Sequence, residues 1–376
     1  MNFEFSDDQK MLKDQARSFL SDKCGSKEVR RVLDGDEPYH PELWQAVAEM
    51  GWLGASIPED YDGLGLGYLE LCVIAEELGR AVAPIPFSST VYLFAEAILA
   101  AGSEEQKKKY LPKIAAGEII GTLAMSEKPG AVTPKSIGAT LKGGKLSGTK
   151  LPVPDGDVAD FAIVVAKTGS GNSENDISLC VVDMKGSGVS TETVDTVDPT
   201  RSHAKVTFDG AEAEELGTTG EGWAIVQRVF DRAAVLFAFE QMGGAQAALD
   251  MGRDYALERY AFGRQIGSFQ AIKHKLADMY VATELARSNC YYGAWALSTD
   301  AAELPLAAAT ARVSATEAYH LSSKENIQVH GGMGFTWEFD CHLHYRRSKL
   351  LSLALGSLPR WKDRLVSCLE ARNEAA

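Results

Sequence analysis

The hydrophobic period of the sequence changes twice, and these changes constrain the fold more than any other feature. Up to about residue 120, apolar residues recur at the spacing of one helix face. From Gly121 to Glu215 the chain shows short alternating runs rich in Val, Thr and Ile, which Gly and Asp turns separate. The helical period returns at Gly222 and continues almost to the end. The chain is therefore predicted to place a β-rich segment between two helical ones.

Three domains are predicted from these changes. Residues 1–120 form an N-terminal helical domain, residues 121–215 a middle antiparallel β-domain of sandwich or barrel type, and residues 216–376 a C-terminal four-helix bundle. A chain of 376 residues is long for a single hydrophobic core, which agrees with several domains. The fold class is therefore α+β and mostly α.

Local signals place the elements within these domains. Helices are expected at Ser6–Ser26, Pro41–Met50, Tyr68–Gly79, Thr90–Ala101 and Glu104–Ala116 in the first domain, and at Trp223–Tyr260, Phe269–Thr299, Leu304–Val329 and Leu343–Arg372 in the last. Strands are expected at residues 139–141, 145–148, 161–165, 178–182 and 204–208.

Composition narrows the class of function. The net charge of −14 argues against a basic surface for nucleic acid or for an anionic membrane. The six cysteines are scattered without metal-ligand spacing, which favours buried thiols in a reducing compartment. The N-terminus lacks an apolar signal region, and no apolar run reaches the roughly 18–20 residues of a membrane span. We therefore expect a cytoplasmic protein without a structural metal.

The segment Leu257–Tyr280 combines an Arg-aromatic-Gly turn with an amphipathic helix. Arg259, Phe262 and Gly263 lie within a few residues of one another, ahead of Gln270. One face of the helix is expected to be buried; it carries Phe269, Ile272, Leu276, Met279 and Tyr280. An Arg and a Gln at facing helix ends can hold a phosphate group, but such a turn can also be a simple helix cap.

Two further segments have residue types that suit a ligand. Residues 328–337 hold three glycines in four positions after a helix, where backbone can approach a ligand closely or can cap the helix. Residues 124–131 begin the β-domain, where extended backbone can face a flat heteroaromatic ring or can form a turn. Either segment alone leaves both interpretations open.

Taken together, these motifs resemble the acyl-CoA dehydrogenase flavoprotein family. The resemblance rests on an RxxFG motif at 259–263 followed by Gln270, a QxxGGxGF motif at 328–335, and the helix–β–helix order. It also includes DPTRSHAKVTFDG at 198–210 and FTWEFDCHLHYRRSKL at 335–350. It covers essentially the whole chain and implies an acyl-CoA dehydrogenase-like fold.

The resemblance implies FAD as the cofactor, bound across a subunit interface of a tetramer. Arg259 is then expected at the flavin pyrophosphate, with Phe262 and Gln270 nearby. Five residues of the adjacent subunit are expected at the ADP portion: Gln328, Val329, His330, Gly331 and Gly332. Met125 and Ser126, in the segment 124–131, are expected against the flavin ring and the thioester.

Family members oxidise an acyl-CoA thioester to its trans-2-enoyl-CoA, and their usual electron acceptor is an electron-transfer flavoprotein. A carboxylate takes the α-proton while the flavin takes a hydride from the β-carbon. Both positions at which the family places this carboxylate are apolar here. The position near the C-terminus is Leu355, and the position on an earlier helix is Ala233.

Glu240 is the remaining carboxylate on the right helix. It follows Ala233 by seven residues, so on a helix it lies about 20° away on the same face and about 10.5 Å further along. A branch of the family that acts on steroid and other bulky CoA esters resembles this chain at that helix, and Glu240 is the expected base. Alternatively, Glu240 pairs with a neighbour such as Lys273 or Lys275; Asp231 is a weaker candidate base.

Three functions follow from the resemblance. The first is an FAD-dependent dehydrogenase for a branched or bulky acyl-CoA, with Glu240 as the base. The second is a non-catalytic or half-site partner subunit of a heterotetrameric acyl-CoA dehydrogenase, since both usual bases are missing. The third is a flavin oxidase or monooxygenase on the same fold. The family's flavin-flanking Trp-Ile-Thr is also replaced, by Leu151-Pro152-Val153 or the residues just after, which puts the flavin contacts of the β-domain in doubt.

Overall fold

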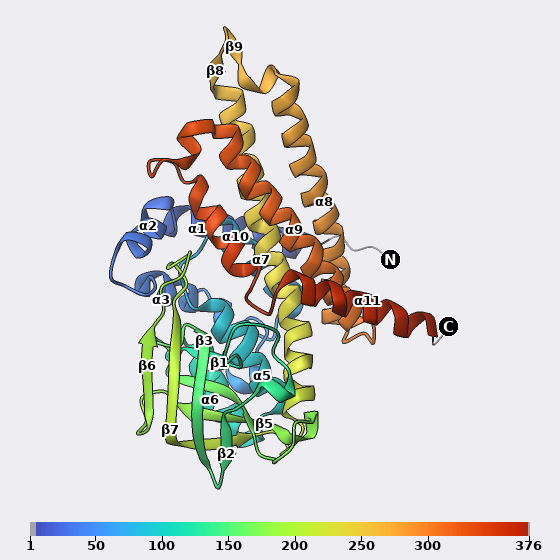
Figure 1. Cartoon of the computed structure of the whole chain (residues 1–376). Helices are drawn as coiled ribbons and strands as arrows, with labels where there is room; N and C mark the ends of the chain where they lie inside the picture. Colours follow the sequence, from blue (N-terminus) through green and yellow to red (C-terminus); the bar gives the residue numbers. More distant parts are fainter. Residues whose placement is uncertain (1–4, 375–376) are drawn as a thin grey trace. The chain divides into compact units, whose positions relative to one another are not determined.

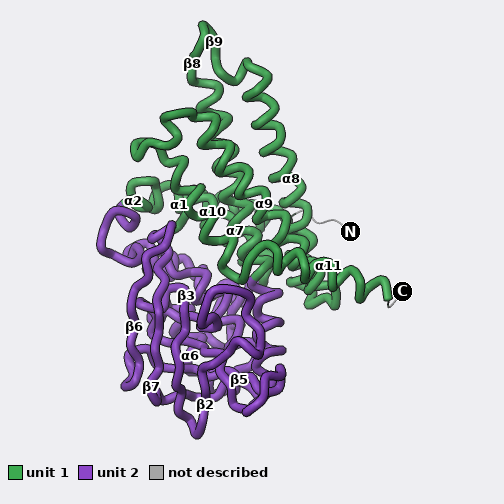
Figure 2. Tube along the Cα trace, in the orientation of Figure 1, with its two compact units in different colours: residues 1–30, 68–83, 234–376 green, residues 31–67, 84–233 purple. Residues whose placement is uncertain are grey.

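A computed structural model describes residues 5–374 of the chain. It contains two compact units (Figure 2). Unit 1 comprises residues 1–30, 68–83 and 234–376, and unit 2 comprises residues 31–67 and 84–233. The border between them falls inside one long helix, α7 (Gly222–Glu258). The three domains predicted from composition, with borders after residues 120 and 215, stay a prediction.

Unit 1 is built from helices (Figure 1). Besides the second part of α7, these are α1 (Asp7–Lys23), α4 (Tyr68–Arg80), α8 (Gln270–Ser298), α9 (Leu304–His330), α10 (Cys341–Leu351) and α11 (Leu358–Glu374). A two-stranded hairpin of β8 (Tyr260–Ala261) and β9 (Arg264–Gln265) joins α7 to α8. A short helix, α2 (Ser26–Asp34), begins in unit 1 and ends in unit 2.

Two sequence predictions for this region were wrong. The helix expected over Leu343–Arg372 is two helices, α10 and α11, because Gly356 between them has a φ of 100° that a continuous helix does not allow. Tyr280 is 57% exposed although the helical period predicted it as buried. Of the predicted face, Met279 is fully buried, and Phe269, Ile272 and Leu276 are half-buried.

Unit 2 contains a seven-stranded sheet. Its strands are β1 (Gly121–Ala124), β2 (Thr140–Lys142), β3 (Lys145–Pro154), β4 (Phe161–Lys167), β5 (Ile177–Asp183), β6 (Val189–Thr193) and β7 (His203–Leu216). Five strands pair in the order β4–β2–β3–β7–β5, and β5 pairs with β4 again. These five strands therefore close a barrel. The prediction of a purely antiparallel domain was wrong in one respect, because β1 and β2 run parallel to β4.

The helices of unit 2 are short apart from the first part of α7. They are α3 (Pro41–Glu49), α5 (Glu96–Ala101) and α6 (Glu104–Ala115), together with a π-helical segment at Ser88–Ala95. This π-helical segment occupies the first half of the helix predicted at Thr90–Ala101. The caps agree with the sequence signals: Ser6 and Ser103 each form a reciprocal capping box, with Gln9 and Gln106.

Two glycines allow α4 and α7 of unit 1 to cross with their backbones in contact. A Cβ added at Gly79 would lie 1.9 Å from the carbonyl oxygen of Glu240. A Cβ added at Gly243 would lie 1.9 Å from the carbonyl oxygen of Glu76. Neither position can hold a side chain unless a helix moves, so this crossing requires glycine on both helices.

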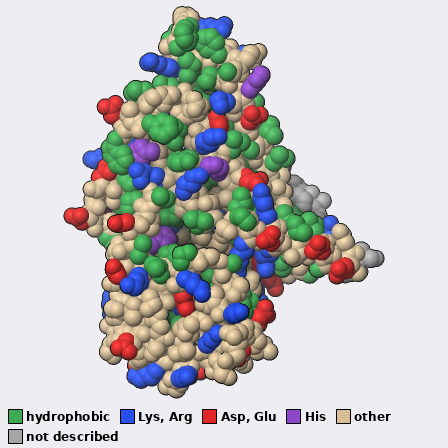
Figure 3. Space-filling model, viewed as in Figure 1, with side chains coloured by type: hydrophobic (Ala, Val, Ile, Leu, Met, Phe, Trp, Pro, Cys, Tyr) green, Lys and Arg blue, Asp and Glu red, His purple; other side chains and the backbone are tan. Residues whose placement is uncertain are grey.

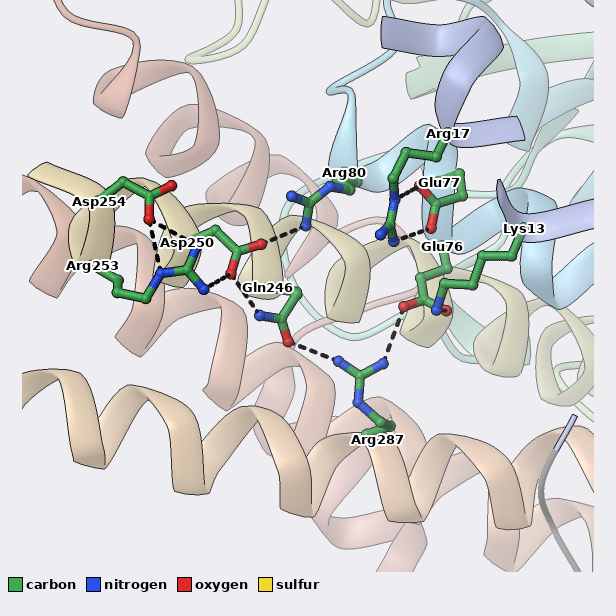
Figure 4. Close-up of polar contacts among 10 residues, drawn as sticks. All are labelled: Lys13, Arg17, Glu76, Glu77, Arg80, Gln246, Asp250, Arg253, Asp254 and Arg287. Carbon is green, nitrogen blue, oxygen red and sulfur yellow. Dashed lines mark hydrogen bonds and ion pairs between the residues drawn. The ribbon is translucent and has the colours of Figure 1, made fainter. Parts of the chain in front are cut away.

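A network of charged side chains surrounds this crossing (Figure 4). The carboxylate of Glu76 accepts from Lys13 of α1 at 2.7 Å and from Arg287 of α8 at 3.1 Å. Arg17 of α1 binds both oxygens of Glu77, at 3.0 and 2.7 Å. Glu76 and Glu77 are almost fully buried, and a buried carboxylate is stable only when it is paired in this way.

We predict that Gly243→Ala lowers the free energy of unfolding by about 3 kcal/mol or more, because its Cβ has no room beside the α4 backbone. The matched control is Gly252→Ala on the same helix, where the nearest atom to the new Cβ is 3.4 Å away. That variant is expected to gain about 0.5–1 kcal/mol from helix propensity. Denaturant unfolding measures both; equal effects of the two substitutions would contradict the crossing.

Candidate functional site

The end of unit 1 that carries the β8–β9 hairpin presents the Arg-aromatic-Gly turn to solvent. α7 ends at Glu258, and the main chain of Arg259 bonds back to Tyr255 and onward to Ile266, both at 2.8 Å. Phe262 and Gly263 form the turn with φ values of 52° and 78°. The Phe262 side chain is 95% exposed. A non-glycine residue with positive φ and an exposed ring indicates a binding position rather than a core position.

Arg264 and Arg259 have different surroundings at this end. The guanidinium of Arg264 lies over the ring of Phe269, 4.1 Å from its centre, and the Phe262 ring contacts the same Phe269 edge-on. Arg259 is exposed, as is Gln270 at the first position of α8. The turn therefore leaves a guanidinium and a helix start accessible to an anionic group.

The glycine segment lies at the C-terminal end of α9. Gly331 has a φ of 61°, and a Cβ added at Gly331 or Gly332 would meet no atom within 4 Å. Gln328 is exposed as well, whereas Val329 and His330 are buried. The exposed glycines therefore offer open backbone to which a ligand can come close.

His330 connects this segment to the end of α7. Its ring stacks on Tyr255 with 4.0 Å between ring centres, and its Nδ1 donates to the carbonyl of Asn326 at 2.9 Å. Burial lowers the pKa of His330, so the ring is neutral near pH 7. Tyr255 directly precedes the turn that holds Arg259, so the two segments with candidate FAD residues lie at the same end of unit 1.

Apolar side chains are also exposed around this end (Figure 3). Among residues 5–374 the exposed large apolar residues include Leu257, Tyr260 and Phe262 at the hairpin, Met333, Phe335 and Trp337 after α9, and Tyr280, Val281 and Leu285 further along α8. Apolar exposure over neighbouring elements is typical of a surface that another chain or a ligand covers. The exposed guanidinium, the open glycine backbone and the apolar rings together suit a dinucleotide cofactor with a diphosphate, as FAD is.

The segment 124–131 lies in unit 2, where it continues from β1. Met125 is buried, Ser126 is half-buried, and residues 128–131 are exposed. The carbonyl of Ser126 accepts from the backbone N–H of Leu151 at 2.8 Å, and the carbonyl of Met125 accepts from the side chain of Lys150 at 3.0 Å. The segment is thus fixed to β3 by its backbone.

Sequence reasoning missed Lys150, which is 0% exposed. A signal for it exists in the alternation of the strand, because Lys150 follows Leu146 by four positions and both are therefore on the same, buried face. A lysine at an inward position of an alternating strand is unusual enough to be noted as a candidate.

Glu240 lies on α7 at the crossing with α4, and its side chain is 0% exposed. Its Oε1 is 3.6 Å from the Nη1 of Arg347, which is also 0% exposed. Arg347 in turn reaches the carbonyls of Val82 and Ala83, each at 3.4 Å. The sequence analysis gave Lys273 or Lys275 as alternative partners of Glu240, and this was wrong. Glu240 pairs with Arg347, and Lys275 binds Glu325 at 2.5 Å.

A second buried arginine stands near Glu240. Arg312 of α9 is fully buried and donates to the side-chain oxygen of Gln241 and to the carbonyl of Leu351. Burial lowers the pKa of Arg312 to about 9, and the charge of Glu240 offsets part of this effect. Glu240 thus provides negative charge between two interior guanidinium groups, which is the structural alternative of the sequence analysis with different cations.

The two positions at which the resemblance would place the base are buried and apolar. Ala233 is 0% exposed. Leu355 is 2% exposed, and its carbonyl accepts from the Nε1 of Trp361 at 3.2 Å. Neither side chain can accept a proton, as the sequence already indicated.

The chain belongs to the acyl-CoA dehydrogenase family. Residues 6–118 match the acyl-CoA dehydrogenase N-terminal domain, and residues 220–358 match the acyl-CoA dehydrogenase C-terminal domain. Acyl-CoA dehydrogenase IpdE2 of Mycobacterium tuberculosis is 34% identical over 345 residues, which are 91% of each chain. The protein is therefore an FAD-dependent flavoprotein oxidoreductase with acyl-CoA dehydrogenase activity.

Solved structures of high similarity include other acyl-CoA dehydrogenases. Butyryl-CoA dehydrogenase of Megasphaera elsdenii superposes with a TM-score of 0.91 at 27% identity, over 98% of this chain and 100% of its own. A Tcur3481-Tcur3483 steroid ACAD variant has a TM-score of 0.88 at 31% identity, over 98% and 99%. The ChsE4-ChsE5 complex of M. tuberculosis has a TM-score of 0.89 at 26% identity, over 98% and 99%. The predicted family and fold class are confirmed.

Other predicted features concern membranes and metals. Within residues 5–374, no helix combines the length and the apolar character that a bilayer crossing requires. In the same part of the chain, no three His, Cys, Asp or Glu side chains are grouped to hold a metal ion. All six cysteines are free thiols.

We predict that Arg259→Ala weakens FAD binding about 10- to 100-fold, the cost of losing a charge-assisted bond to the diphosphate. The matched control is Arg253→Ala, because Arg253 is an exposed arginine in the last turns of α7, shortly before Arg259, and pairs with Asp254 at 2.8 Å. Flavin fluorescence during dialysis measures retention. Equal FAD loss from both variants would remove Arg259 from the cofactor site.

Proposed function

We propose that the chain takes part in the α,β-dehydrogenation of a branched or bulky acyl-CoA thioester, which yields the trans-2-enoyl-CoA. The observation that carries this proposal is the end of unit 1, where the Arg259 turn and the Gly331 turn adjoin through the Tyr255–His330 stack. Support for a bulky acyl group comes from the steroid ACAD variant among the similar structures. The acyl-CoA is then a fused-ring or branched ester rather than a short linear one.

The residues that would hold FAD come from both segments, the hairpin after α7 and the glycine segment after α9. Arg259, Phe262 and Gln270 are proposed at the pyrophosphate, and residues 328–332 of an adjacent subunit at the ADP portion. FAD held by these residues would supply the acceptor for the hydride of the β-carbon. The exposed apolar side chains around the hairpin support subunit contact, and therefore a homotetramer or heterotetramer that shares the cofactor.

Glu240 is the proposed base for the α-proton. Its carboxylate is fully buried on α7, so bulk water is kept away from the group that would take the proton. To act, Glu240 must contact the α-carbon of the substrate while Arg347 keeps its position through the carbonyls of Val82 and Ala83. The remaining proposals are a cytoplasmic location and an electron-transfer flavoprotein as the electron acceptor.

We predict that Glu240→Gln leaves FAD bound but abolishes the bleaching of the flavin by substrate, because an amide cannot take the α-proton. Glu77→Gln is the matched control, since Glu77 is another buried carboxylate of unit 1 that pairs with an arginine. Both variants remove a buried carboxylate charge that pairs with an arginine. The cost is about 3–5 kcal/mol where both partners are buried, as at Glu240, and smaller at Glu77, whose partner Arg17 is 43% exposed. Only Glu240→Gln is expected to lose bleaching at full FAD occupancy; retained bleaching would remove the role of Glu240 as base.

A second function is favoured by the same residue. Glu240 is fully buried beside Arg347, and the two other base positions are Ala233 and Leu355. A carboxylate with a structural cation is poorly placed to exchange that cation for a substrate α-carbon. These observations favour a half-site subunit, whose acyl-CoA dehydrogenase activity then depends on a flavin site that a second chain completes. The similar ChsE4-ChsE5 complex gives a precedent for two-chain assembly.

Expression of the chain alone and with a paralogue separates the two functions. For a partner subunit we expect a colourless protein alone, and a yellow complex that a bulky acyl-CoA bleaches only after co-expression. For a self-sufficient enzyme we expect a yellow homo-oligomer that the same ester bleaches. Absorption spectra before and after addition of acyl-CoA esters, combined with size-exclusion chromatography, distinguish these outcomes.

A further inference from the structure

Lys150 brings a positive charge into the interior of unit 2. Its side chain is 0% exposed, at a buried position of β3. Moving an ammonium group out of water costs several kcal/mol unless strong partners surround it. A lysine at such a position needs an opposite charge or hydrogen-bond acceptors that stabilise its ammonium group.

The partners of Lys150 belong to the segment that follows β1. Its Nζ donates to the carbonyl of Met125 at 3.0 Å and to Oε1 of Glu127 at 2.8 Å. The Glu127 carboxylate also accepts from the backbone N–H groups of Gly138 and Ala139, at 2.7 and 2.9 Å. Glu127 is thereby fixed from two sides, and it in turn fixes the position of the ammonium group.

The protonation of this pair agrees with its geometry. Burial by itself raises the pKa of Glu127, but the Lys150 charge and the three hydrogen bonds outweigh burial and lower the pKa below its usual value. Burial lowers the pKa of Lys150, and Glu127 opposes that change. With 2.8 Å between Nζ and Oε1, the two groups form an ion pair.

The carbonyl of Met125 transmits the effect of Lys150 to the opposite side of the segment. This carbonyl shares one trans peptide unit with the N–H of Ser126, so the N–H points away from Lys150. A hydrogen bond from a cation draws electron density toward the carbonyl oxygen, which strengthens the N–H as a donor, by about 10–30% in condensed-phase estimates. The next carbonyl, that of Ser126, is held by the N–H of Leu151. The Ser126 N–H is therefore both oriented and polarised.

We propose that Lys150 is a positioning residue for FAD: through the Met125–Ser126 peptide it orients and polarises the Ser126 N–H toward the flavin ring, and it raises the reduction potential of bound FAD. This inference rests on the proposed function, from which it takes the contact of Met125 and Ser126 with FAD. Reduction adds electrons to the ring, so a stronger donor beside the ring favours the reduced form. Because Glu127 cancels much of the Lys150 charge at longer range, the effect acts mainly through the peptide.

This arrangement compensates for the side chains that the β-domain lacks. Leu151, Pro152 and Val153 offer no side-chain hydrogen bond to a flavin, because all three are apolar. A backbone donor does not depend on those side chains. Lys150 and Glu127 therefore preserve a flavin contact that the sequence put in doubt.

Three variants of the FAD-loaded enzyme, with its partner chain if one is needed, test the inference. Lys150→Met removes the cation, Lys150→Arg keeps it, and Lys150→Met with Glu127→Gln removes both charges. Redox titration of the bound flavin gives the midpoint potential, the visible spectrum reports the surroundings of the ring, and thermal unfolding reports stability.

Lys150→Met is expected to shift the equilibrium between reduced and oxidised FAD toward the oxidised form, on the order of tenfold. Lys150→Arg is expected to retain the wild-type potential and spectrum. The double variant is expected to recover thermal stability, because no unpaired carboxylate remains, while its potential stays shifted. If the double variant recovers both stability and wild-type potential, Lys150 is purely structural and the inference is overturned.

A separate measurement tests the FAD contact on which the inference rests. Amide hydrogen exchange of the wild type, with and without FAD, is expected to show protection of the Ser126 N–H by the cofactor. Absence of protection overturns the proposed contact itself. Protection together with an unchanged potential in Lys150→Met overturns only the role of Lys150.

Discussion

The crossing of α4 and α7 is the contact on which unit 1 depends. Gly79 and Gly243 let the two backbones touch, each helix placing a glycine against a carbonyl of the other. The two carbonyls that face these glycines belong to Glu240 and Glu76. The carboxylate of Glu76 binds Arg287 of α8, and the carboxylate of Glu240 pairs with Arg347 of α10. The crossing therefore determines where both helices lie and where the buried charges of the unit must be matched.

The ion pair with Arg347 explains why Glu240 can be interpreted in two ways, as a catalytic base or as a structural carboxylate. Arg347 binds the carbonyls of Val82 and Ala83, and Val82 is a β-branched residue with a φ of 51°, a conformation that costs free energy. By holding Arg347, Glu240 helps to stabilise this turn after α4. The same burial that suits a general base also suits an ion pair that maintains the fold. A carboxylate in this position serves catalysis only if the substrate reaches it without disturbing Arg347.

Unit 2 also contains a buried charge that is neutralised by an ion pair, that of Lys150 with Glu127. The two side chains fix the segment 125–127 to β3 and to the backbone of residues 138–139. The backbone of that segment is therefore defined by an interior ion pair rather than by the exposed residues 128–131 that follow it. A cofactor that binds there meets a rigid edge, which lowers the entropic cost of ordering it.

The sequence alone determined the order of helical and β-rich segments, because hydrophobic period is a local property, and it determined the family, because several spaced motifs occur together. It also showed that Leu355 and Ala233 cannot be bases. It did not reveal the parallel pairing of β1 with β4, the break between α10 and α11, or the partners of Glu240 and Lys150. Those features depend on contacts between residues such as Glu240 and Arg347, or Glu127 and Lys150, that lie far apart along the chain. Only the tertiary structure brings such residues together. Local periodicity predicts which face of a helix or strand is buried, but it does not predict which charged residue of another element contacts that face.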